Sequence, residues 1–137
     1  MSVSVNAYIG LGANLGDAAA SVRAAIHLLG ELPNTTIGGC SSLYRSAPID
    51  ATGDDFVNAA VQLETMLDAH TLLRELQRIE RDFGRARPFR NAPRTLDLDL
   101  LVFGDSVIQD KLLEVPHPRM GNRAFVLLPL YELNPQL

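Results

Sequence analysis

This sequence has little cysteine and no long apolar run, and both shortages restrict where the protein can work. Its single cysteine, Cys40, excludes an internal disulfide and is compatible with a reducing compartment. No stretch approaches the roughly 20 apolar residues that are needed to span a bilayer. Residues 1–6 lack the basic start and apolar core of a secretory signal. We therefore expect a cytoplasmic protein without a membrane partner.

Lysine is equally scarce: Lys111 is the only one, so positive charge is carried almost entirely by arginine. The formal net charge of -4 argues against nonspecific nucleic-acid binding as the main task. The arginines concentrate between residues 81 and 94, where Asp82 is the only acidic residue. Guanidinium groups suit bidentate contact with phosphate or carboxylate. The segment predicts either a local site for a small polyanion or a charged loop that only faces solvent.

The length and the periodicity of the chain predict one domain of mixed structure. With 137 residues the chain is long enough for one core and too short for two ordinary domains, so we expect a single domain over residues 1–137. Strands are expected over residues 3–11, 35–47 (bent at Gly38–Gly39), 56–66 and 94–103. Helices are expected over residues 17–32 and 68–83, capped by Asp17 and Asp68, and over residues 123–132. A short strand over residues 107–109 is expected to form a hairpin with the fourth strand.

The order of these elements is that of a ferredoxin-like βαββαβ sandwich. We predict an α+β domain with the sheet on one side and the helices on the other, extended by a C-terminal hairpin strand and helix. This fold hosts enzymes, RNA-binding modules and regulatory domains alike. The function must therefore be argued from the residues of the site.

The most informative segment is residues 94–101, RTLDLDLL. On a strand, Asp97 and Asp99 point to one face while the intervening leucines pack on the other. Two carboxylates at this spacing can converge on a hard cation, and magnesium takes one or two carboxylates together with substrate phosphates. A solvent-facing amphipathic strand would show the same alternation. The neighbouring arginines, and the repulsion between adjacent like charges, favour the metal site.

Carboxylates, magnesium and several guanidinium groups together are the components of phosphoryl transfer, in which positioning and charge stabilisation supply the catalysis. Neither common nucleotide motif is present: residues 10–16 have the wrong spacing for a dinucleotide fingerprint, and no P-loop lysine follows them. His117, held between Pro116 and Pro118, has a restricted backbone that suits a fixed phosphate contact. One cysteine and three scattered histidines argue against a zinc site.

Several motifs along nearly the whole chain are specific in combination. They are residues 8–17 (YIGLGANLGD), 42–48 (SLYRSAP), 56–61 (FVNAAV), 84–85 (GR), 93–99 (PRTLDLD), 115–119 (VPHPR) and 122–127 (NRAFVL). Together they resemble the 6-hydroxymethyl-7,8-dihydropterin pyrophosphokinase family of folate biosynthesis. The resemblance implies that the hydroxyl of the reduced pterin attacks the β-phosphorus of ATP, so that pyrophosphate is transferred and AMP leaves.

The resemblance also implies roles for individual residues. Asp97 and Asp99 would hold two magnesium ions that bridge the ATP phosphates, and Arg85 and Arg87 would neutralise charge at the transition state. The implied ATP site comprises Gln77, Glu80, Arg87, Arg94, His117 and Arg123. The implied pterin pocket comprises Ser46, Ala47, Ile49, Phe56, Asn58 and Phe125. Gln77 and Glu80 suit hydrogen bonds with the nucleoside, because a carboxylate repels phosphate.

The chemistry of the implied pterin pocket is consistent with its ligand. Phe56 and Phe125 can sandwich a flat heterocycle, while Asn58 can read its polar edge. Core packing would use the same aromatic residues. Phe56 stands where a tyrosine is often found, and it keeps the stacking face without the hydroxyl. The pocket is thus expected to bind the reduced pterin, with details that differ from other members.

Two other functions were weighed against the enzyme. A noncatalytic binding or regulatory domain explains the strand order and the aromatic pair, but it gives no reason for Asp97 and Asp99 beside the arginines. An RNA-binding module would use aromatic stacking on its central strands, which this acidic sequence does not offer. We expect a monomer whose partners are ATP and the reduced hydroxymethylpterin, with no nucleic acid, and a second folate enzyme beside it is not excluded by the sequence.

Overall fold

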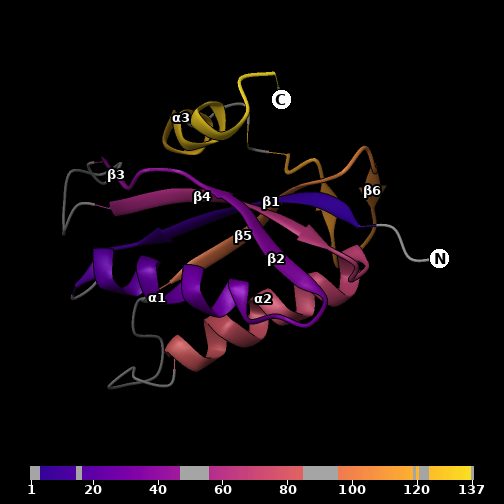
Figure 1. The fold of residues 1–137 in the computed structure, drawn as a ribbon, viewed down its shortest axis with the longest axis horizontal. Coiled ribbons are helices and arrows are strands. Elements are labelled where there is room, and N and C mark those ends of the chain that lie inside the picture. The colour runs from indigo at the N-terminus through magenta and orange to yellow at the C-terminus, as the bar shows by residue number, and fades with distance from the viewer. Residues whose placement is uncertain are drawn as a thin grey trace.

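The computed structural model describes residues 4–14, 17–46, 56–84, 96–118, 120 and 124–136. These residues form a layered arrangement of strands and helices (Figure 1). The strands are β1 (Val5–Ala13), β2 (Thr35–Cys40), β3 (Tyr44–Ser46), β4 (Phe56–Thr65), β5 (Asp97–Phe103), β6 (Ile108–Gln109) and β7 (Glu114–Val115). The helices are α1 (Ala18–Gly30), α2 (Ala69–Gly84) and α3 (Ala124–Leu133).

The first two helices begin at the aspartates that the sequence predicted as caps. The side chain of Asp17 accepts a hydrogen bond of 3.1 Å from the backbone N–H of Ala20. Asp68 accepts one of 2.7 Å from the backbone N–H of Thr71, and this bond holds the pKa of its carboxyl below the ordinary value. Each cap satisfies one of the amide groups that a helix start leaves without an intrahelical partner.

Five strands form an antiparallel sheet. Four of them follow the order β2-β4-β1-β5, and β3 pairs with the first residues of β4. The second strand was expected to be bent or bulged at Gly38–Gly39, and the structure has a register shift between Ile37 and Gly39. The single strand expected over residues 35–47 is instead two strands. The backbone leaves the sheet at Ser42, because its N–H is bonded to the Glu132 carboxylate of α3 at 3.0 Å rather than to β4.

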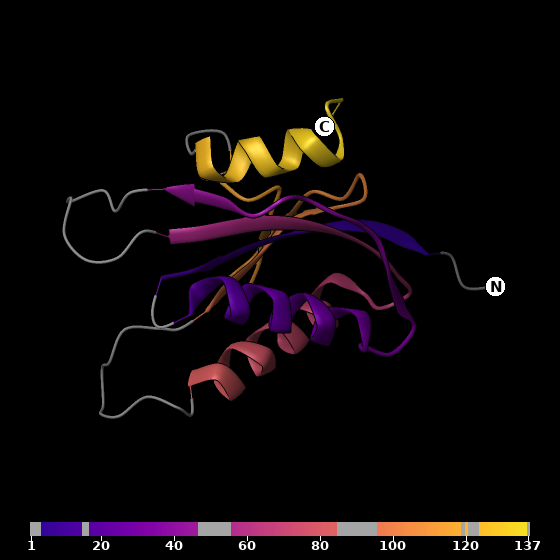
Figure 2. The ribbon, with the colours of Figure 1, turned by 60° about the vertical axis from the view of Figure 1, so that its left-hand side comes forward.

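Helices cover both faces of this sheet, so the prediction that all of them lie on one side was wrong. Figures 1 and 2 show α1 and α2 beneath the sheet and α3 above it. The reason is that both faces are apolar. Alternate residues of the strands pack against α1 and α2, while Tyr8, Ala60 and Leu101 on the other face are covered by Leu130 of α3. An antiparallel sheet with two helices on one face is still compatible with the ferredoxin-like arrangement.

The expected hairpin between residues 107–109 and the fourth strand was also wrong. β6 pairs with β7 in a separate two-stranded sheet, with Ile108 opposite Val115. The chain turns away from β5 at Gly104, whose φ is 54°. Asp110 then closes the turn between β6 and β7, since its side chain accepts bonds of 2.9 and 2.8 Å from the N–H groups of Leu112 and Leu113. Local turn chemistry therefore decides this pairing.

The described ranges contain no helix that is both long enough and apolar enough to cross a bilayer.

Candidate active site

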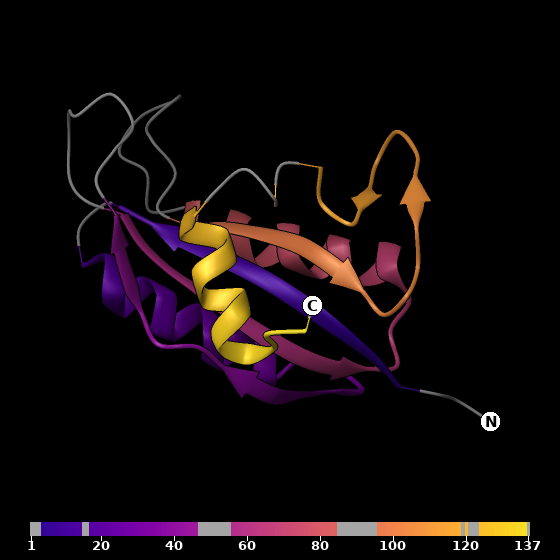
Figure 3. The ribbon, with the colours of Figure 1, turned by 90° about the horizontal axis from the view of Figure 1, so that it is seen from above.

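The two aspartates of β5 lie on the sheet face that carries α3. Asp97 and Asp99 are exposed, whereas Leu98 and Leu100 are buried against the core beneath the sheet. The predicted alternation is therefore confirmed. Figure 3 shows α3 lying across the strands of this face, where its main contacts are with β4 and β3. Both aspartates remain exposed, so their carboxylates are accessible to a ligand.

A bulge follows the carboxylate pair directly. Tyr8 of β1 pairs with Val102 and Ile9 pairs with Leu100, so Leu101 is an extra residue on β5. Leu101 and Val102 consequently both face α3 in the smaller apolar cluster. Bulges commonly re-aim side chains next to active sites. Here the bulge ends the polar stretch of β5 and begins its packing against Tyr8.

The outer edge of β5 is held by α2. One oxygen of the Glu80 carboxylate accepts a hydrogen bond of 2.8 Å from the backbone N–H of Leu98, between the two aspartates. Gln77 lies nearly one turn earlier on the same helix and is exposed. The sequence did not anticipate the contact with Leu98. Hydrogen bonding of Gln77 and Glu80 to a nucleoside stays a prediction.

His117 is bonded through its backbone to the same strand, β5. Its backbone N–H donates a hydrogen bond of 2.8 Å to the carbonyl of Leu101, two residues beyond Asp99. The side chain is half-buried. The structure thus anchors the predicted phosphate-binding histidine to the strand that carries both carboxylates, although the two lie 18 or more residues apart in the sequence.

Three of the residues expected in the pterin pocket lie together at the other edge of the sheet. Ser46 of β3 pairs with Phe56 of β4, and Asn58 follows on the same face of β4. The Asn58 amide is only 6% exposed, and its Nδ2 donates a hydrogen bond of 3.0 Å to the Ser46 hydroxyl. The buried amide is therefore fixed in orientation, as a group that reads a heterocycle must be.

The register of the sheet connects this edge to the carboxylates. Gly12 of β1 pairs with Asn58 on one side and with Asp97 on the other. Because directly paired residues point to the same face, the Asn58 amide and the Asp97 carboxylate face the same side, separated by one strand. The sequence places these two residues on different strands, but only the pairing register aligns them.

Glu132 of α3 is a structural contributor that the sequence analysis missed. Its carboxylate accepts a bond of 2.6 Å from the Tyr44 hydroxyl, and bonds of 3.0 and 3.1 Å from the N–H and the hydroxyl of Ser42. These bonds, led by that from Tyr44, hold the pKa of Glu132 below its ordinary value and raise the pKa of Tyr44. They tie the start of β3 to α3, two residues before Ser46. A separation of about 90 residues left no sequence signal for this contact.

Several expected site residues lie outside the described ranges. They are Ala47, Ile49, Arg85, Arg87, Arg94 and Arg123. Phe125 is the second residue of α3. The assignments of these residues to the ATP site, the transition state or the pterin pocket stay predictions from the sequence.

The donor set fits a hard cation that is shared with a ligand. Within the described part of the chain, no group of three or more histidine, cysteine or acidic side chains forms a complete metal cage. Asp97 and Asp99 supply two carboxylates on one exposed face. Magnesium commonly binds one or two protein carboxylates and takes its remaining ligands from phosphates and water. The pair therefore fits magnesium bound together with a phosphate-containing ligand.

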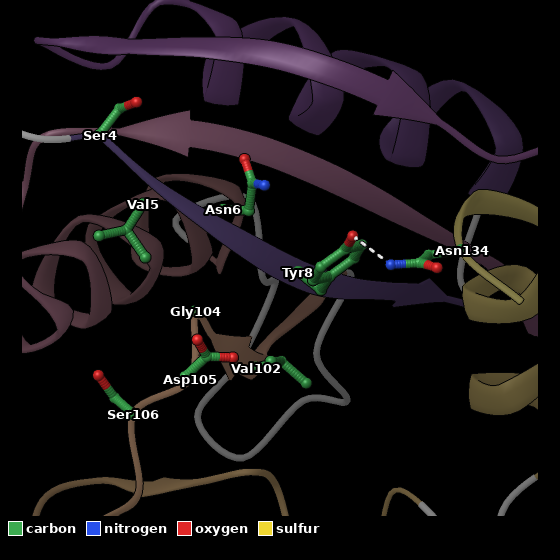
Figure 4. Close-up of a pocket in the computed structure, with 9 residues that line it drawn as sticks. All are labelled: Ser4, Val5, Asn6, Tyr8, Val102, Gly104, Asp105, Ser106 and Asn134. Atoms are coloured by element: carbon green, nitrogen blue, oxygen red, sulfur yellow. Dashed lines mark hydrogen bonds between the residues drawn. The ribbon is translucent and has the colours of Figure 1, made fainter. Parts of the chain in front are cut away.

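A separate cavity of about 420 Å³ lies at the far end of the same sheet face (Figure 4). Its lining comes from the first half of β1, the end of β5 and Asn134, whose amide donates a bond of 3.2 Å to the Tyr8 hydroxyl. Gly12 and Asp97 lie at the other end of these strands. The cavity is thus distinct from the candidate site.

Comparison with known proteins identifies the family of this chain. Residues 8–135 match the family model described as 7,8-dihydro-6-hydroxymethylpterin-pyrophosphokinase. The 2-amino-4-hydroxy-6-hydroxymethyldihydropteridine pyrophosphokinase of Haemophilus influenzae is 44% identical over 94% of this chain and 81% of its own length. The protein of the same name from Bacillus subtilis is 42% identical over 96% of this chain and 79% of its own length.

A third relative is part of a larger protein. The bifunctional protein FolKE of Lactococcus lactis is 39% identical over 92% of this chain, which corresponds to 36% of that protein. The exposed carboxylate pair on the α+β sheet and the names of these relatives indicate the same class of protein. The chain is a transferase of phosphate-containing groups. More specifically, it belongs to the 7,8-dihydro-6-hydroxymethylpterin-pyrophosphokinase family, as the sequence motifs predicted.

Proposed function

We propose that this protein transfers pyrophosphate from ATP to the hydroxymethyl group of 6-hydroxymethyl-7,8-dihydropterin, releasing AMP. Membership of the family supports the reaction. The structural observation that carries the proposal is the alignment of Asn58, Gly12 and Asp97 across three adjacent strands. It puts a fixed amide for a heterocycle and a carboxylate for a phosphate-bound cation on one face of one sheet.

In this reaction the hydroxyl oxygen of the pterin forms a bond to the β-phosphorus of ATP. The bond between that phosphorus and the oxygen leading to the α-phosphate breaks, and AMP departs. Asn58, oriented by Ser46, holds the polar edge of the pterin while Phe56 contacts its flat face. Asp97 and Asp99 would hold two magnesium ions, and bound magnesium would neutralise charge on the phosphates.

The remaining assignments rest on the family match over residues 8–135. His117 and Arg94 bind the phosphates of ATP in the ground state, and Gln77 and Glu80 form hydrogen bonds with its nucleoside. Arg85 and Arg87 neutralise the charge that develops at the transition state. The other residues proposed to contact ATP or the pterin are Arg123, Ala47, Ile49 and Phe125.

The wider proposals follow from the same reading. Residues 1–137 act as one ferredoxin-like domain, supported by the strand order and by the two helices beneath the sheet. We also propose that the protein works in the cytoplasm, which its single cysteine supports, and that it acts as a monomer. The negative net charge supports a role without nucleic acid.

The decisive experiment incubates the protein with ATP, magnesium and 6-hydroxymethyl-7,8-dihydropterin. The expected products are AMP and the pterin diphosphate, in equal amounts and only when magnesium is present. Formation of ADP would show transfer of the terminal phosphate instead. No nucleotide product at all, with a protein that binds ATP and the pterin, would favour the noncatalytic binding domain.

A further inference from the structure

The middle of the candidate site is bare backbone. On the face toward α3, β1 presents Tyr8, then Gly10 and Gly12. Gly12 is half-exposed. Its two neighbours across the sheet are Asn58 on β4 and Asp97 on β5. The chain therefore has polar groups on both sides of β1 at this level and no side chain between them.

Among the described residues, one side chain restricts the space over Gly12. A Cβ atom added at Gly12 would lie 3.0 Å from Oδ1 of Asn58, the one atom of the described ranges within 4 Å of that Cβ. Asn58 cannot easily turn away, because it is buried and its Nδ2 is bonded to Ser46. A methyl group at this position would thus stand beside the amide and narrow the passage toward Asp97.

The other glycine of this strand has a different neighbour. A Cβ atom at Gly10 would meet Cδ1 of Leu101 at 3.2 Å, which is the flexible end of an apolar side chain. Gly10 consequently makes room for the side chain that the β5 bulge turns toward α3. Packing accounts for the lack of a side chain at Gly10, whereas at Gly12 the described part of the chain places a polar amide oxygen, and no apolar group, against the added Cβ.

We infer that the bare backbone of Gly12 is the floor of the transfer path, over which the β-phosphorus and the pterin hydroxyl meet. The inference rests on the proposed function. The backbones of Asn58, which would hold the acceptor, and of Asp97, which would hold the phosphate, are about 9.5 Å apart, because two strand spacings separate them. Any direct path between the two groups crosses β1 at Gly12, because Gly12 is the β1 residue that pairs with both Asn58 and Asp97.

This geometry makes Gly12 a position that controls the rate of the transfer step rather than the binding of either substrate alone. A methyl group there leaves Asp97 and Asp99 in place for ATP and magnesium. The same methyl group moves the pterin hydroxyl away from the β-phosphorus by a fraction of the width of a methyl group. A misplacement of about 1 Å between reacting groups can reduce a rate by about 10²-fold.

The test compares Gly12→Ala with Gly38→Ala. Gly38 is an exposed glycine of β2 where an added Cβ would meet side-chain atoms of Gln62 and Glu64 only at 3.5 Å or beyond. Turnover, equilibrium binding of a nonhydrolysable ATP analogue with magnesium, and the thermal midpoint are measured for both. We expect Gly12→Ala to lower kcat about 10²-fold with little change in ATP-analogue affinity, and Gly38→Ala to match the parent protein. A kcat for Gly12→Ala within a few-fold of the parent would overturn the inference.

A second pair of variants distinguishes obstruction of the transfer path from displacement of Asn58. It also removes the contact between the new methyl group and Oδ1 of Asn58, in case Gly12→Ala folds poorly. Asn58→Ser removes the oxygen that the new methyl would meet. Gly12→Ala is then added to Asn58→Ser. If the methyl obstructs transfer, the double variant turns over more slowly than Asn58→Ser alone. Equal kcat values would show that the methyl acts only through Asn58 and would refute the inference. Failure of the parent protein to form AMP would instead refute the proposed function.

Discussion

The carboxylate of Glu80 accepts a hydrogen bond of 2.8 Å from the backbone N–H of Leu98. Leu98 lies between the two candidate metal ligands on β5, which is the edge strand of the sheet. An edge strand leaves its outward N–H groups without a partner strand, and Glu80 satisfies one of them. α2 therefore supports the strand at the point where the carboxylate pair projects.

Removal of this support should weaken both the fold and the site. We expect Glu80→Ala to reduce the free energy of unfolding by about 1.5–3 kcal/mol, the range for a hydrogen bond to a charged group, and to raise the magnesium concentration needed for half-maximal activity. Glu75→Ala is the matched control, because within the described ranges Glu75 forms an ion pair with Arg78 on the surface of the same helix. Urea unfolding and magnesium titration are the measurements. Equal stability of the two variants would contradict the supporting role.

The carboxylate pair should be required for turnover and not for folding. Asp97→Asn and Asp99→Asn each remove one negative oxygen donor and relieve repulsion between neighbouring carboxylates. We expect each to lower kcat by at least about 10²–10³-fold, the scale for loss of one preorganised charge-stabilising group, with a thermal midpoint equal to or above that of the parent. Asp105→Asn, at the exposed turn after β5, should leave kcat unchanged. Full activity of either site variant would rule out the metal assignment.

The contact between Glu132 and Tyr44 should appear in the pH dependence of stability. Because the folded-state pKa of Glu132 is lowered, chiefly by the Tyr44 hydroxyl, its stabilising effect is complete above the ordinary carboxyl pKa of about 4.3. It is lost as the pH falls through the lower folded-state value. The raised pKa of Tyr44 acts in the opposite sense, so stability declines above about pH 10.

Replacement of Glu132 should remove both of these trends. We expect Glu132→Gln to flatten the decline in the free energy of unfolding on the acid side of pH 4.3, a value close to the ordinary carboxyl pKa, and to raise the KM for the pterin more than that for ATP. Glu114→Gln, at the exposed residue of β7, is the control. The idea fails if the acid limb of the unfolding curve is the same in Glu132→Gln as in the parent.

The two arginines on either side of residues 86–93 should differ in what they contribute. Interactions made mainly at the transition state raise turnover more than they tighten ground-state binding. Arg85→Ala should therefore lower kcat by roughly 10³–10⁵, the range for arginine fingers, with little loss of ATP-analogue affinity. Arg94→Ala should weaken ATP-analogue binding directly. Single-turnover kinetics beside equilibrium binding test this division, which is wrong if Arg85→Ala reduces affinity as much as rate.

Local patterns in the sequence determined the helix starts, the alternation on β5 and the family. Asp17 and Asp68 cap helices because their side chains bond to amides three residues on. Asp97 and Asp99 face one side because strand residues alternate. Each of these features depends on neighbours within a few residues, and such neighbours are visible in the sequence.

Only the tertiary structure decided what meets across the sheet. Ser42 leaves the edge of β4 because Glu132, from the far end of the chain, accepts its N–H. α3 lies on the second face because that face is apolar around Tyr8. Gly12 separates Asn58 from Asp97 because strand register, which the sum of long-range contacts sets, brings these three residues into one line. The sequence identified the candidate site residues, and packing between distant segments determined how far apart they lie and which residue separates them.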